Sequence, residues 1–429
     1  MKSTKGTYID LTDFTYWSGH FTGIQRTVYN IAKQLKQQDK TVRYVAYSQG
    51  KYQLIHQDID SIAKIGITSI QQDINIGQNT NAHKAGLKYA SKKYARYVLS
   101  KLKRRAARMV SIRHTEVNAI ENLYGRTISF SIGDRLVILG GIWNDSSNFE
   151  YATDLVINKH IKLTCLFYDL IPVYGYHTFG DSLLSIFSRY VFEILSVADT
   201  ILSISDTTKK DILRFKEELC IVNDFKLVNV RLGDSIPMTI SKKQQDLMTR
   251  SYFTPFIISV GTIEARKNHI QIYAALRLAD ELGILHKIPH IFIIGKIGWL
   301  AGDTVRLITY DETVNKKVTI LSNIDDGQLA WFYKNAQYTI YTSQYEGWGL
   351  PVAEALSYGV PVITSKGTSM EEVAPGLVKL VSPYDSRELL EAMLDYADPD
   401  LNRTAREAIF KGFKLTTWED TAIKIRESL

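Results

Sequence analysis

Short apolar runs rich in β-branched residues alternate with stretches of helical period along most of the chain. In the first half these runs predict strands at residues 7–11, 41–47, 135–141, 162–170, 199–205 and 226–233. In the second half they predict strands at 255–261, 290–295, 317–322, 338–343 and 361–365, with helical patterns notably at 22–37, 181–197 and 268–282. This alternation is typical of parallel sheets built from βαβ units. We therefore predict an α/β fold with two Rossmann-like, doubly wound domains.

The length of the chain supports two domains. Its 429 residues exceed the roughly 250 to 300 at which single hydrophobic cores stop growing. A polar stretch at 241–251 separates the two sets of strands, so we expect an N-terminal, acceptor-side domain at 1–245 and a second domain at 246–400. The remainder, 401–429, is helical and carries Trp418. Ligands of such sheets bind beyond the carboxyl ends of the strands, which predicts a site in a central cleft between the domains.

The net charge of +7 is concentrated in one segment. Between His83 and His114 there are eleven Lys and Arg and no acidic residue, in a predicted insertion at 80–115. Apolar side chains recur there at helical spacing, which indicates an amphipathic helix for an anionic membrane surface, through Lys84 to Arg113. A solvated insertion or binding to nucleic-acid phosphates are the alternatives, and we expect no nucleic acid.

Other features of composition favour a cytoplasmic protein. Cys165 and Cys220 lack metal-ligand spacing and predict buried thiols in a reducing compartment. The first residues lack the apolar core of a signal peptide, and no run approaches 18 apolar residues. Asp58 and Asp60 resemble a metal-binding pair, but no other ligand types lie nearby and we expect no metal there.

The stretch Glu-Gly-Trp-Gly-Leu-Pro at 346–351 carries the strongest chemical signal. Pro351 suits a first helical position and predicts a helix at 351–358, with a preceding loop whose backbone N–H groups attract anions. Gly347 and Gly349 would allow a ligand to approach the backbone closely. Glu346 and Glu354 would accept hydrogen bonds from sugar hydroxyls. An ordinary capped helix with solvated glutamates is the alternative.

Polar residues follow other predicted strands. Arg266 and Lys267 stand at a strand-to-helix junction, where two cations can neutralise a pyrophosphate, although a solvated turn is an alternative. Asp169 ends another strand and is a candidate for binding a hydroxyl, or else a buried structural aspartate. Gly23 precedes a predicted helix and would admit a phosphate or sugar, with Arg26 in reach. The loops after 290–295 and 317–322 are candidates for a nucleobase.

Together these motifs resemble glycosyltransferase family 4, the retaining, metal-independent enzymes with the two-Rossmann GT-B architecture. The resemblance rests mainly on Glu346 and Glu354 in "EGWGLPVAEALSYGVPVI", about 80 residues after "VGTIEARKN". "TGIQR" and "YDLIP" are similar to the branch that builds bacterial surface polysaccharides, with its mannosyl and rhamnosyl transferases. Thr262 stands where many members have arginine, and Tyr168 where many have histidine.

The resemblance implies roles for individual residues. Arg266 and Lys267 would bind the donor pyrophosphate, Glu346 the sugar hydroxyls and Glu354 the ribose. The last helix, with Trp418, would cross back to the first domain. The implied catalytic residues are Lys267, Arg266, Glu346 and Asp169, and the other donor-binding positions are Gly23, Arg26, Gly261, Gly295, Lys296, Ile324, Gly347, Trp348, Gly349, Leu350 and Glu354.

The expected activity is transfer of a hexose from a nucleotide-diphosphate sugar to a hydroxyl of a lipid-linked glycan, with retention at the anomeric carbon. The family suggests mannose from GDP-mannose, with dTDP- or UDP-sugars as alternatives, and implies no cofactor and no metal. Such an enzyme would work at the cytoplasmic face of the inner membrane. The rivals are a nucleotide-sugar epimerase, a phosphorylase, and an inactive scaffold of a polysaccharide assembly complex.

Overall fold

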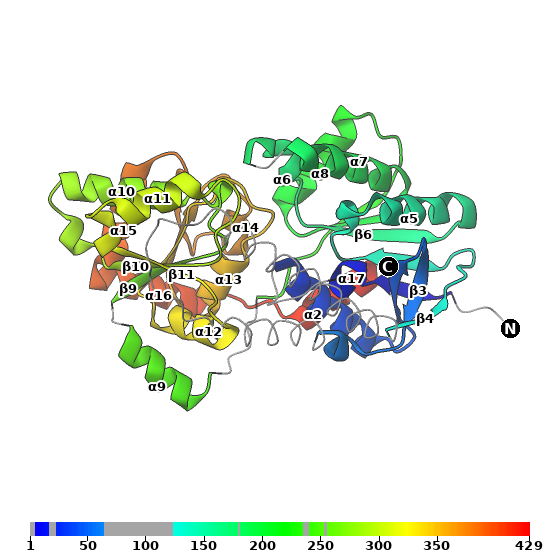
Figure 1. Cartoon of the computed structure of the whole chain (residues 1–429), viewed down its shortest axis with the longest axis horizontal. Helices are drawn as coiled ribbons and strands as arrows, with labels where there is room; N and C mark the ends of the chain where they lie inside the picture. The colour runs from blue at the N-terminus through cyan, green and yellow to red at the C-terminus, as the bar shows by residue number, and fades with distance from the viewer. Residues whose placement is uncertain (1–4, 17–22, 64–122, 179–180, 235–239, 253–254) are drawn as a thin grey trace, which may run out of the picture. The chain divides into compact units, whose positions relative to one another are not determined.

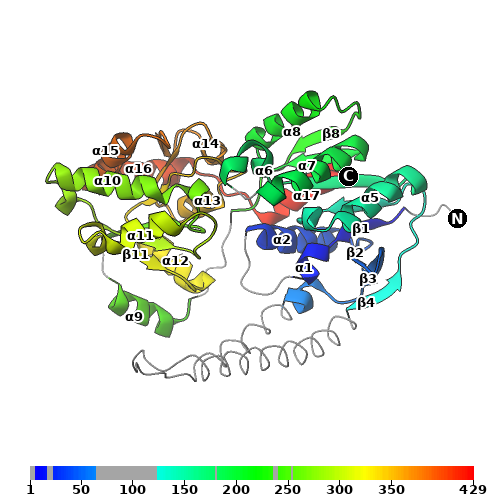
Figure 2. The same ribbon diagram turned by 45° about the horizontal axis from the view of Figure 1, so that its top comes forward.

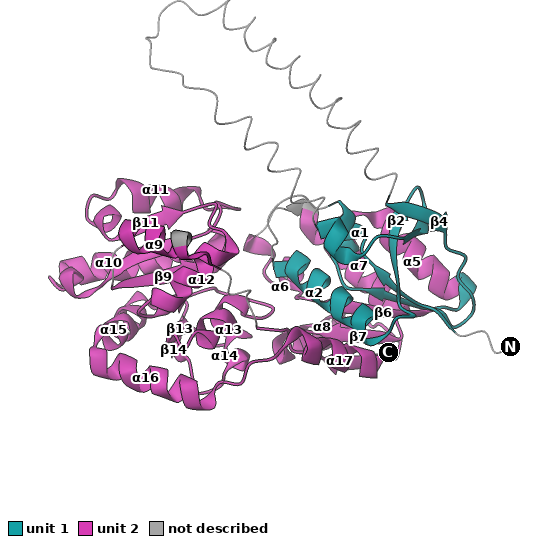
Figure 3. Cartoon of the chain, turned by 90° about the horizontal axis from the view of Figure 1, so that it is seen from below, with its two compact units in different colours: residues 1–142, 158–161 teal, residues 143–157, 162–429 magenta. Residues whose placement is uncertain are grey.

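The computed structural model describes residues 5–16, 23–63, 123–178, 181–234, 240–252 and 255–429. The basic insertion predicted at 80–115 lies outside these residues. Two compact units make up the chain (Figure 3): the first comprises 1–142 and 158–161, and the second 143–157 and 162–429. The predicted domain boundary between 245 and 246 divides the two sheets rather than these units, and it stays a prediction.

The strands form two sheets (Figure 1). The strand orders are β4-β3-β2-β1-β5-β6-β7-β8 in the first sheet and β11-β10-β9-β12-β13-β14 in the second. The first contains β1 (Thr7–Asp10), β2 (Arg43–Ser48), β3 (Lys51–Ile55), β4 (Tyr124–Thr127), β5 (Arg135–Ile138), β6 (Lys162–Phe167), β7 (Thr200–Ser203) and β8 (Lys226–Asn229). The second contains β9 (Phe256–Val260), β10 (His290–Ile294), β11 (Val318–Leu321), β12 (Thr339–Tyr341), β13 (Val362–Ser365) and β14 (Lys379–Val381). The predicted α/β fold with two Rossmann-like sheets is confirmed.

Helices follow most strands. The first unit has α1 (Thr12–Thr15) and α2 (Gly23–Gln38). The first half of the second unit has α5 (Ser146–Lys159), α6 (Ile171–Tyr174), α7 (Asp181–Val197) and α8 (Asp206–Glu218). Then come α9 (Lys242–Ser251), α10 (His269–Glu281), α11 (Gly302–Tyr310), α12 (Asp326–Asn335), α13 (Leu350–Ser357), α14 (Met370–Val373), α15 (Ser386–Ala397), α16 (Pro399–Gly412) and α17 (Trp418–Ser428). The helices predicted at 22–37, 181–197 and 268–282 match α2, α7 and α10 within one residue.

Three of the strands in the described residues, β3, β4 and β14, were not predicted from the sequence. β3 and β4 pair antiparallel beyond β2 and form an edge, where half-polar sequences leave no continuous apolar run. The hairpin between β2 and β3 turns at Gln49 and Gly50, both with positive φ. The glycine of this dipeptide is the sequence feature that could have predicted the hairpin, because such turns need left-handed backbone at both central positions. β14 has only three residues and also closes an edge.

Successive apolar side chains along the strands of the second sheet point to opposite faces, and helices cover both faces (Figure 2). Ile257, Ile291 and Ile293 share a core with buried residues of α10 and α15. Phe256 and Phe292 point to the other face, where their rings contact Phe332 of α12. Because successive side chains of a strand face opposite sides, runs that are apolar throughout indicate a sheet buried on both faces.

The C-terminal helix packs beside the end of the first sheet. Thr421 of α17 donates to the carbonyl of Arg231 at 2.9 Å, and Lys226 of β8 reaches the carbonyl of Ser428 at 3.4 Å. A Cβ on Gly233 would lie 2.6 Å from the indole of Trp418. The helix therefore returns to residues of the predicted first domain, as the resemblance implied. Within the described part of the chain, no helix is long and apolar enough to cross a membrane.

Candidate active site at the switch point of the second sheet

The order of the second sheet brings two loops together. From β9 the chain builds outward through β10 and β11, then returns to place β12 on the other side of β9. β9 and β12 are parallel neighbours, so their carboxyl ends meet at one edge of the sheet. A doubly wound sheet opens a ligand-binding crevice at such a switch point. The turn η3 (Ala265–Lys267) follows β9 there, and the loop at 342–349 follows β12.

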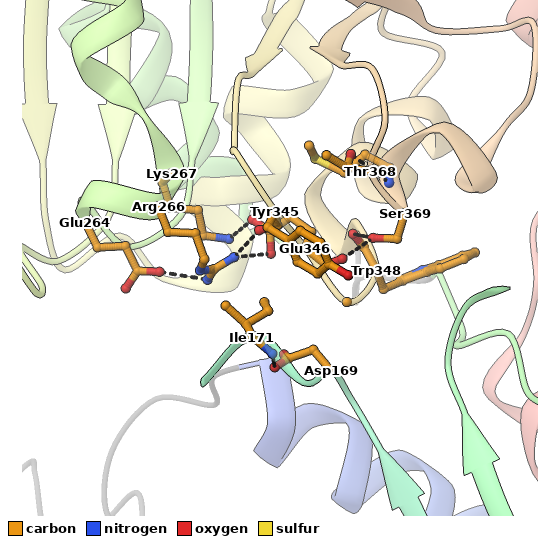
Figure 4. A network of polar contacts seen from close by, with 12 residues as sticks. Asp169, Ile171, Glu264, Arg266, Lys267, Tyr345, Glu346, Trp348, Thr368 and Ser369 are labelled. Atoms are coloured by element: carbon orange, nitrogen blue, oxygen red, sulfur yellow. Dashed lines mark hydrogen bonds and ion pairs between the residues drawn. The ribbon is translucent and has the colours of Figure 1, made fainter. Parts of the chain in front are cut away.

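Arg266 joins these two loops (Figure 4). Its Nη1 donates to the carbonyl of Tyr345 at 2.7 Å and lies 2.7 Å from Oε2 of Glu346. Its Nη2 lies 2.7 Å from Oε1 of Glu264. Burial by itself lowers the pKa of Arg266, but the carboxylates of Glu346 and Glu264 outweigh burial and raise it. The guanidinium is therefore permanently charged and held in one orientation.

Lys267 completes the cluster. Its Nζ lies 2.5 Å from Oε1 of Glu346, so the two oxygens of this carboxylate are shared between the two cations. The side chain of Glu346 is 14% exposed. Burial alone raises the pKa of Glu346, but the charges of Arg266 and Lys267 outweigh it and bring the pKa down to about 2. The fold thus brings Arg266 and Lys267 next to Glu346, which lies 79 residues after Lys267 in the chain, and the roles implied for them at a donor stay predictions.

The helix after this loop is α13, which begins at Leu350 with Pro351 in its first turn. The predicted helix at 351–358 is therefore confirmed with a shift of one residue. Ser369 fixes the loop from behind: its Oγ lies 2.6 Å from the carbonyl oxygen of Glu346 and 2.9 Å from that of Trp348. The single hydroxyl proton of Ser369 is shared between these two carbonyls, which restrains the loop backbone. The first N–H groups of the helix that follows lack intrahelical acceptors and make an end that attracts anions.

The structure shows that Gly347 and Gly349 pack closely against other parts of the protein, which the sequence alone did not predict. A Cβ on Gly347 would lie 2.0 Å from the carbonyl oxygen of Tyr168. A Cβ on Gly349 would lie 3.1 Å from Cγ of Met370. Close packing against backbone therefore excludes a side chain at Gly347, whereas one at Gly349 would require Met370 to shift. The predicted approach of a ligand to their backbone stays a prediction.

Glu354 lies in a buried hydrogen-bond network. Its Oε2 accepts a hydrogen bond of 2.9 Å from the hydroxyl of Tyr333, which lies 3.1 Å from the hydroxyl of Tyr341. Burial, with the charge of Glu354, raises the pKa of both tyrosines, which keeps them protonated as donors. The contact predicted between Glu354 and a ribose stays a prediction.

Two glycines meet where β9 and β10 end. Gly261 has φ +146°, and a Cβ on Gly295 would lie 1.9 Å from the carbonyl oxygen of Gly261. Lys296, which follows, is exposed, and Ile324 is half-buried after β11. The structure thus places Gly261, Gly295, Lys296 and Ile324 on consecutive strand ends, and their roles at a nucleobase stay predictions.

Asp169 lies next to the charged cluster. Its Oδ1 accepts the N–H of Ile171 at 3.0 Å, and its Cβ would be 2.9 Å from a Cβ on Gly347. Burial raises the pKa of Asp169, while the charge of Arg266 lowers it and that of Glu346 raises it. The carboxyl group therefore responds to the same charges that hold the loop, and its predicted contact with a hydroxyl stays a prediction.

Gly23 and Arg26 belong to the first unit, where Gly23 is the first residue of α2. Their predicted roles toward a donor stay predictions. Asp58 bonds the N–H of Ser61 at 2.9 Å, and Asp60 pairs with Lys33 at 2.8 Å. Among residues with described positions, no group of three or more metal-ligating side chains gathers.

Sequence reasoning missed several residues around the site. Ser369 and Tyr333 hold site residues through contacts more than 20 residues apart in the sequence, while Glu264 pairs with Arg266 two residues later. His269 is buried directly after the cluster, and burial with the charge of Lys267 lowers its pKa to about 4. Asn268, which has positive φ, donates to the carbonyl of Thr342 at 3.0 Å and so ties η3 to the end of β12. The Asn-His dipeptide directly after Arg266 and Lys267 is the sequence feature that could have indicated these two residues.

Residues 251–409 match the family model for "Glycosyl transferases group 1". The match covers 159 of the 429 residues, so this part of the chain is similar to that family. The resemblance to a bacterial polysaccharide glycosyltransferase with two Rossmann-like domains is confirmed, while assignment to family 4 stays a prediction.

Part of the chain is similar to two mannosyltransferases of Escherichia coli. The serotype-specific mannosyltransferase WbdA of Escherichia coli is 33% identical over 187 residues, which cover 41% of this chain and 22% of WbdA. O-antigen chain mannosyltransferase B of E. coli is 28% identical over 218 residues, covering 48% of this chain and 55% of that protein. The chain thus spans about a fifth and about half of the lengths of these two relatives.

The fold as a whole is shared with solved structures. Sucrose-phosphate synthase from Thermosynechococcus elongatus aligns with a TM-score of 0.60 and 16% identity, over 99% of this chain and 98% of that one. At this identity the similarity concerns the fold.

Proposed function

We propose that the protein is a glycosyltransferase that moves a hexose from a nucleotide-diphosphate sugar to a hydroxyl of a glycan, with retention at the anomeric carbon. The observation that carries this proposal is the cluster of Arg266, Lys267 and Glu346 beside the start of α13, at the switch point of the second sheet. The relatives described above are named as mannosyltransferases, which favours mannose and GDP-mannose as the donor.

The chemistry of the cluster suits departure of a diphosphate. As the bond to the anomeric carbon breaks, negative charge develops on the departing oxygen, and preorganised cations stabilise such charge best. Arg266 and Lys267 are held in place by Glu346 before any donor arrives, so little reorganisation is needed. Phosphate oxygens would then share the two cations with Glu346, while the N-terminus of α13 supplies further N–H donors.

The proposed acceptor is a hydroxyl group of a growing glycan, and we assign its binding to Asp169, which lies next to the cluster. The departing diphosphate oxygen would take the acceptor proton on the same face of the sugar, which gives retention without a covalent enzyme intermediate. One relative is named as an O-antigen chain mannosyltransferase, which supports a glycan as the acceptor. That this glycan is lipid-linked, and that the enzyme works at the cytoplasmic face of the inner membrane, is part of the proposal and rests on the resemblance of the sequence to the polysaccharide-building branch. Transfer of rhamnose or glucose from dTDP- or UDP-sugars is the alternative.

The test is ligand-dependent thermal stability, followed by product analysis. GDP-mannose, dTDP-rhamnose, UDP-glucose and UDP-GlcNAc are added separately, each with and without EDTA. A ligand at 100 times its Kd stabilises the folded state by about 2.7 kcal/mol, which is a measurable rise in Tm. One donor should give this rise in EDTA, and NMR of the product should show the anomeric configuration of the donor. No rise with any donor, in a folded sample, would favour the inactive scaffold.

A further inference from the structure

The short helix α14 contacts two separate parts of the second unit. On one side, Glu372 reaches the N-terminus of α8: its Oε2 accepts the N–H of Asp206 at 2.6 Å, and its Oε1 accepts the N–H of Thr207 at 2.8 Å. The hydroxyl of Thr207 donates to the same Oε1 at 2.5 Å. The first N–H groups of a helix lack intrahelical acceptors and attract negative charge, so this carboxylate is well matched to its position.

On its other side, α14 holds the loop that carries Glu346. Ser369, directly before the helix, is fully buried and bonds to the carbonyls of Glu346 and Trp348 (Figure 4). Met370 and Val373 pack closely against Gly349, where a Cβ would lie 3.1 Å from Cγ of Met370 and 3.2 Å from a methyl group of Val373. A displacement of α14 would therefore be transmitted directly to the backbone of residues 346–349.

α8 also touches this loop itself. The hydroxyl of Thr208 lies 3.0 Å from the carbonyl of Tyr168 and 3.3 Å from that of Gly347. Asp211, one turn further along α8, accepts a hydrogen bond from the hydroxyl of Tyr345. The contacts thus form a closed ring from α8 through Glu372 to α14, through Ser369 to the loop, and through Tyr345 back to α8.

We propose that Glu372 is a positioning residue for the loop at 345–350. It makes no contact with Arg266 or Lys267 in the structure, and it acts by fixing α14 against α8. The relevance of this loop to a nucleotide-sugar donor rests on the proposed function, but the positioning itself concerns the protein alone.

Glu371 provides a matched control. It is the neighbouring glutamate on the same helix, and its carboxylate accepts the N–H of Gly367, four residues earlier. Glu372→Ala and Glu371→Ala therefore remove the same chemical group from the same helix. Only the first removes a contact with α8. Glu372→Gln keeps an amide oxygen that can accept from Thr207 but removes the charge.

The first measurement is hydrogen exchange of the amides at 345–350 in the full chain without ligand. Glu372→Ala should speed exchange there by about fivefold or more, the lower range of couplings between sites. Glu371→Ala should leave these rates unchanged, and Glu372→Gln should lie between. Unchanged rates in Glu372→Ala, or equal acceleration throughout the second sheet, would overturn the proposal.

The second measurement uses the donor identified by the thermal-shift panel. Glu372→Ala should raise the KM for donor by about fivefold or more, with a smaller change in kcat, because the loop is less often in its binding geometry. A loss confined to kcat, or an equal loss in Glu371→Ala, would contradict the proposal. Failure of the wild-type protein to bind any nucleotide sugar would count against the proposed function, while the exchange experiment would still decide the role of Glu372.

Discussion

The ammonium group of Lys267 lies 2.5 Å from the carboxylate of Glu346, although 79 residues separate them in the chain. The pair is only partly exposed, at 20% for Lys267 and 14% for Glu346. Its two members come from the ends of adjacent parallel strands, so the topology of the sheet, rather than local sequence, creates the contact.

Replacing Lys267 should impair transfer far more than folding. Lys267→Ala removes a cation that would stabilise the departing diphosphate, and we expect kcat to fall about 100- to 1000-fold, as for loss of one preorganised donor. Arg266 remains to pair with Glu346, so the protein should still unfold cooperatively. Steady-state transfer assays and thermal unfolding test this, with exposed Lys411→Ala as the control. Equal activity of the two variants would refute the role of Lys267.

The stability contributed by Glu346 should depend on pH. Its folded-state pKa of about 2 lies below the ordinary value of 4.5, so the unfolded chain takes up this proton first as pH falls. The contribution is fully present above pH 4.5 and is lost as pH falls toward 2, with an upper size of about 3 kcal/mol.

Urea unfolding of wild type and Glu346→Gln at pH 6 and pH 3 tests this dependence. The wild-type protein should be the more stable of the two at pH 6, and the difference in unfolding free energy should narrow at pH 3. The exposed Glu391→Gln variant should keep a constant difference from wild type. A difference that does not change with pH would show that Glu346 is not held as an anion by Arg266 and Lys267.

His269 should stay neutral in the folded protein under mildly acidic conditions. Burial and the neighbouring charge of Lys267 lower its pKa to about 4, while the unfolded chain titrates near 6.5. The unfolded state therefore binds more protons between these values, and stability falls as pH drops from 6.5 to 4. The NMR chemical shifts of the His269 imidazole should stay nearly constant between pH 8 and pH 5. Titration with a midpoint near 6.5 would contradict the packing around His269.

Gly347 should tolerate no side chain. In Gly347→Ala the new Cβ would meet the carbonyl oxygen of Tyr168 at 2.0 Å, so the loop backbone must move. We expect a lower Tm and weaker donor binding, because the same backbone carries Glu346. Gly302→Ala is the matched control: nothing lies within 4 Å of its Cβ, and it begins α11. Comparable Tm values for the two variants would contradict the close packing at Gly347.

Local sequence patterns predicted the regular elements well because each pattern reflects a local cause. Apolar runs located the central strands β9, β10 and β13, and Pro351 located the start of α13. The candidate site was also accessible to this reasoning, since Arg266, Lys267 and Glu346 directly follow predicted strands. The edge strand β4 was not, because its exposed polar residues carry no apolar signal.

What holds the site in place could not be predicted from local patterns. Ser369 reads as an ordinary turn residue, yet its hydroxyl fixes two carbonyls of the loop before α13. Glu372 reads as a solvated helix residue, yet it bonds to α8. Such contacts depend on where the sheet order places distant segments. The glycines of the loop were recognised, but the reason for them, packing against Tyr168 and Met370, emerged only in three dimensions.

The pair Gly261 and Gly295 sets a limit on redesign of the protein. Since the carbonyl of Gly261 fills the volume that any side chain at Gly295 would need, these two strand ends form one inflexible corner. Attempts to alter donor choice by diversifying position 295 should yield unfolded or distorted proteins, whichever nucleotide the site accepts. Libraries should instead vary Lys296, which is exposed, and Ile324, which is half-buried; both follow strand ends.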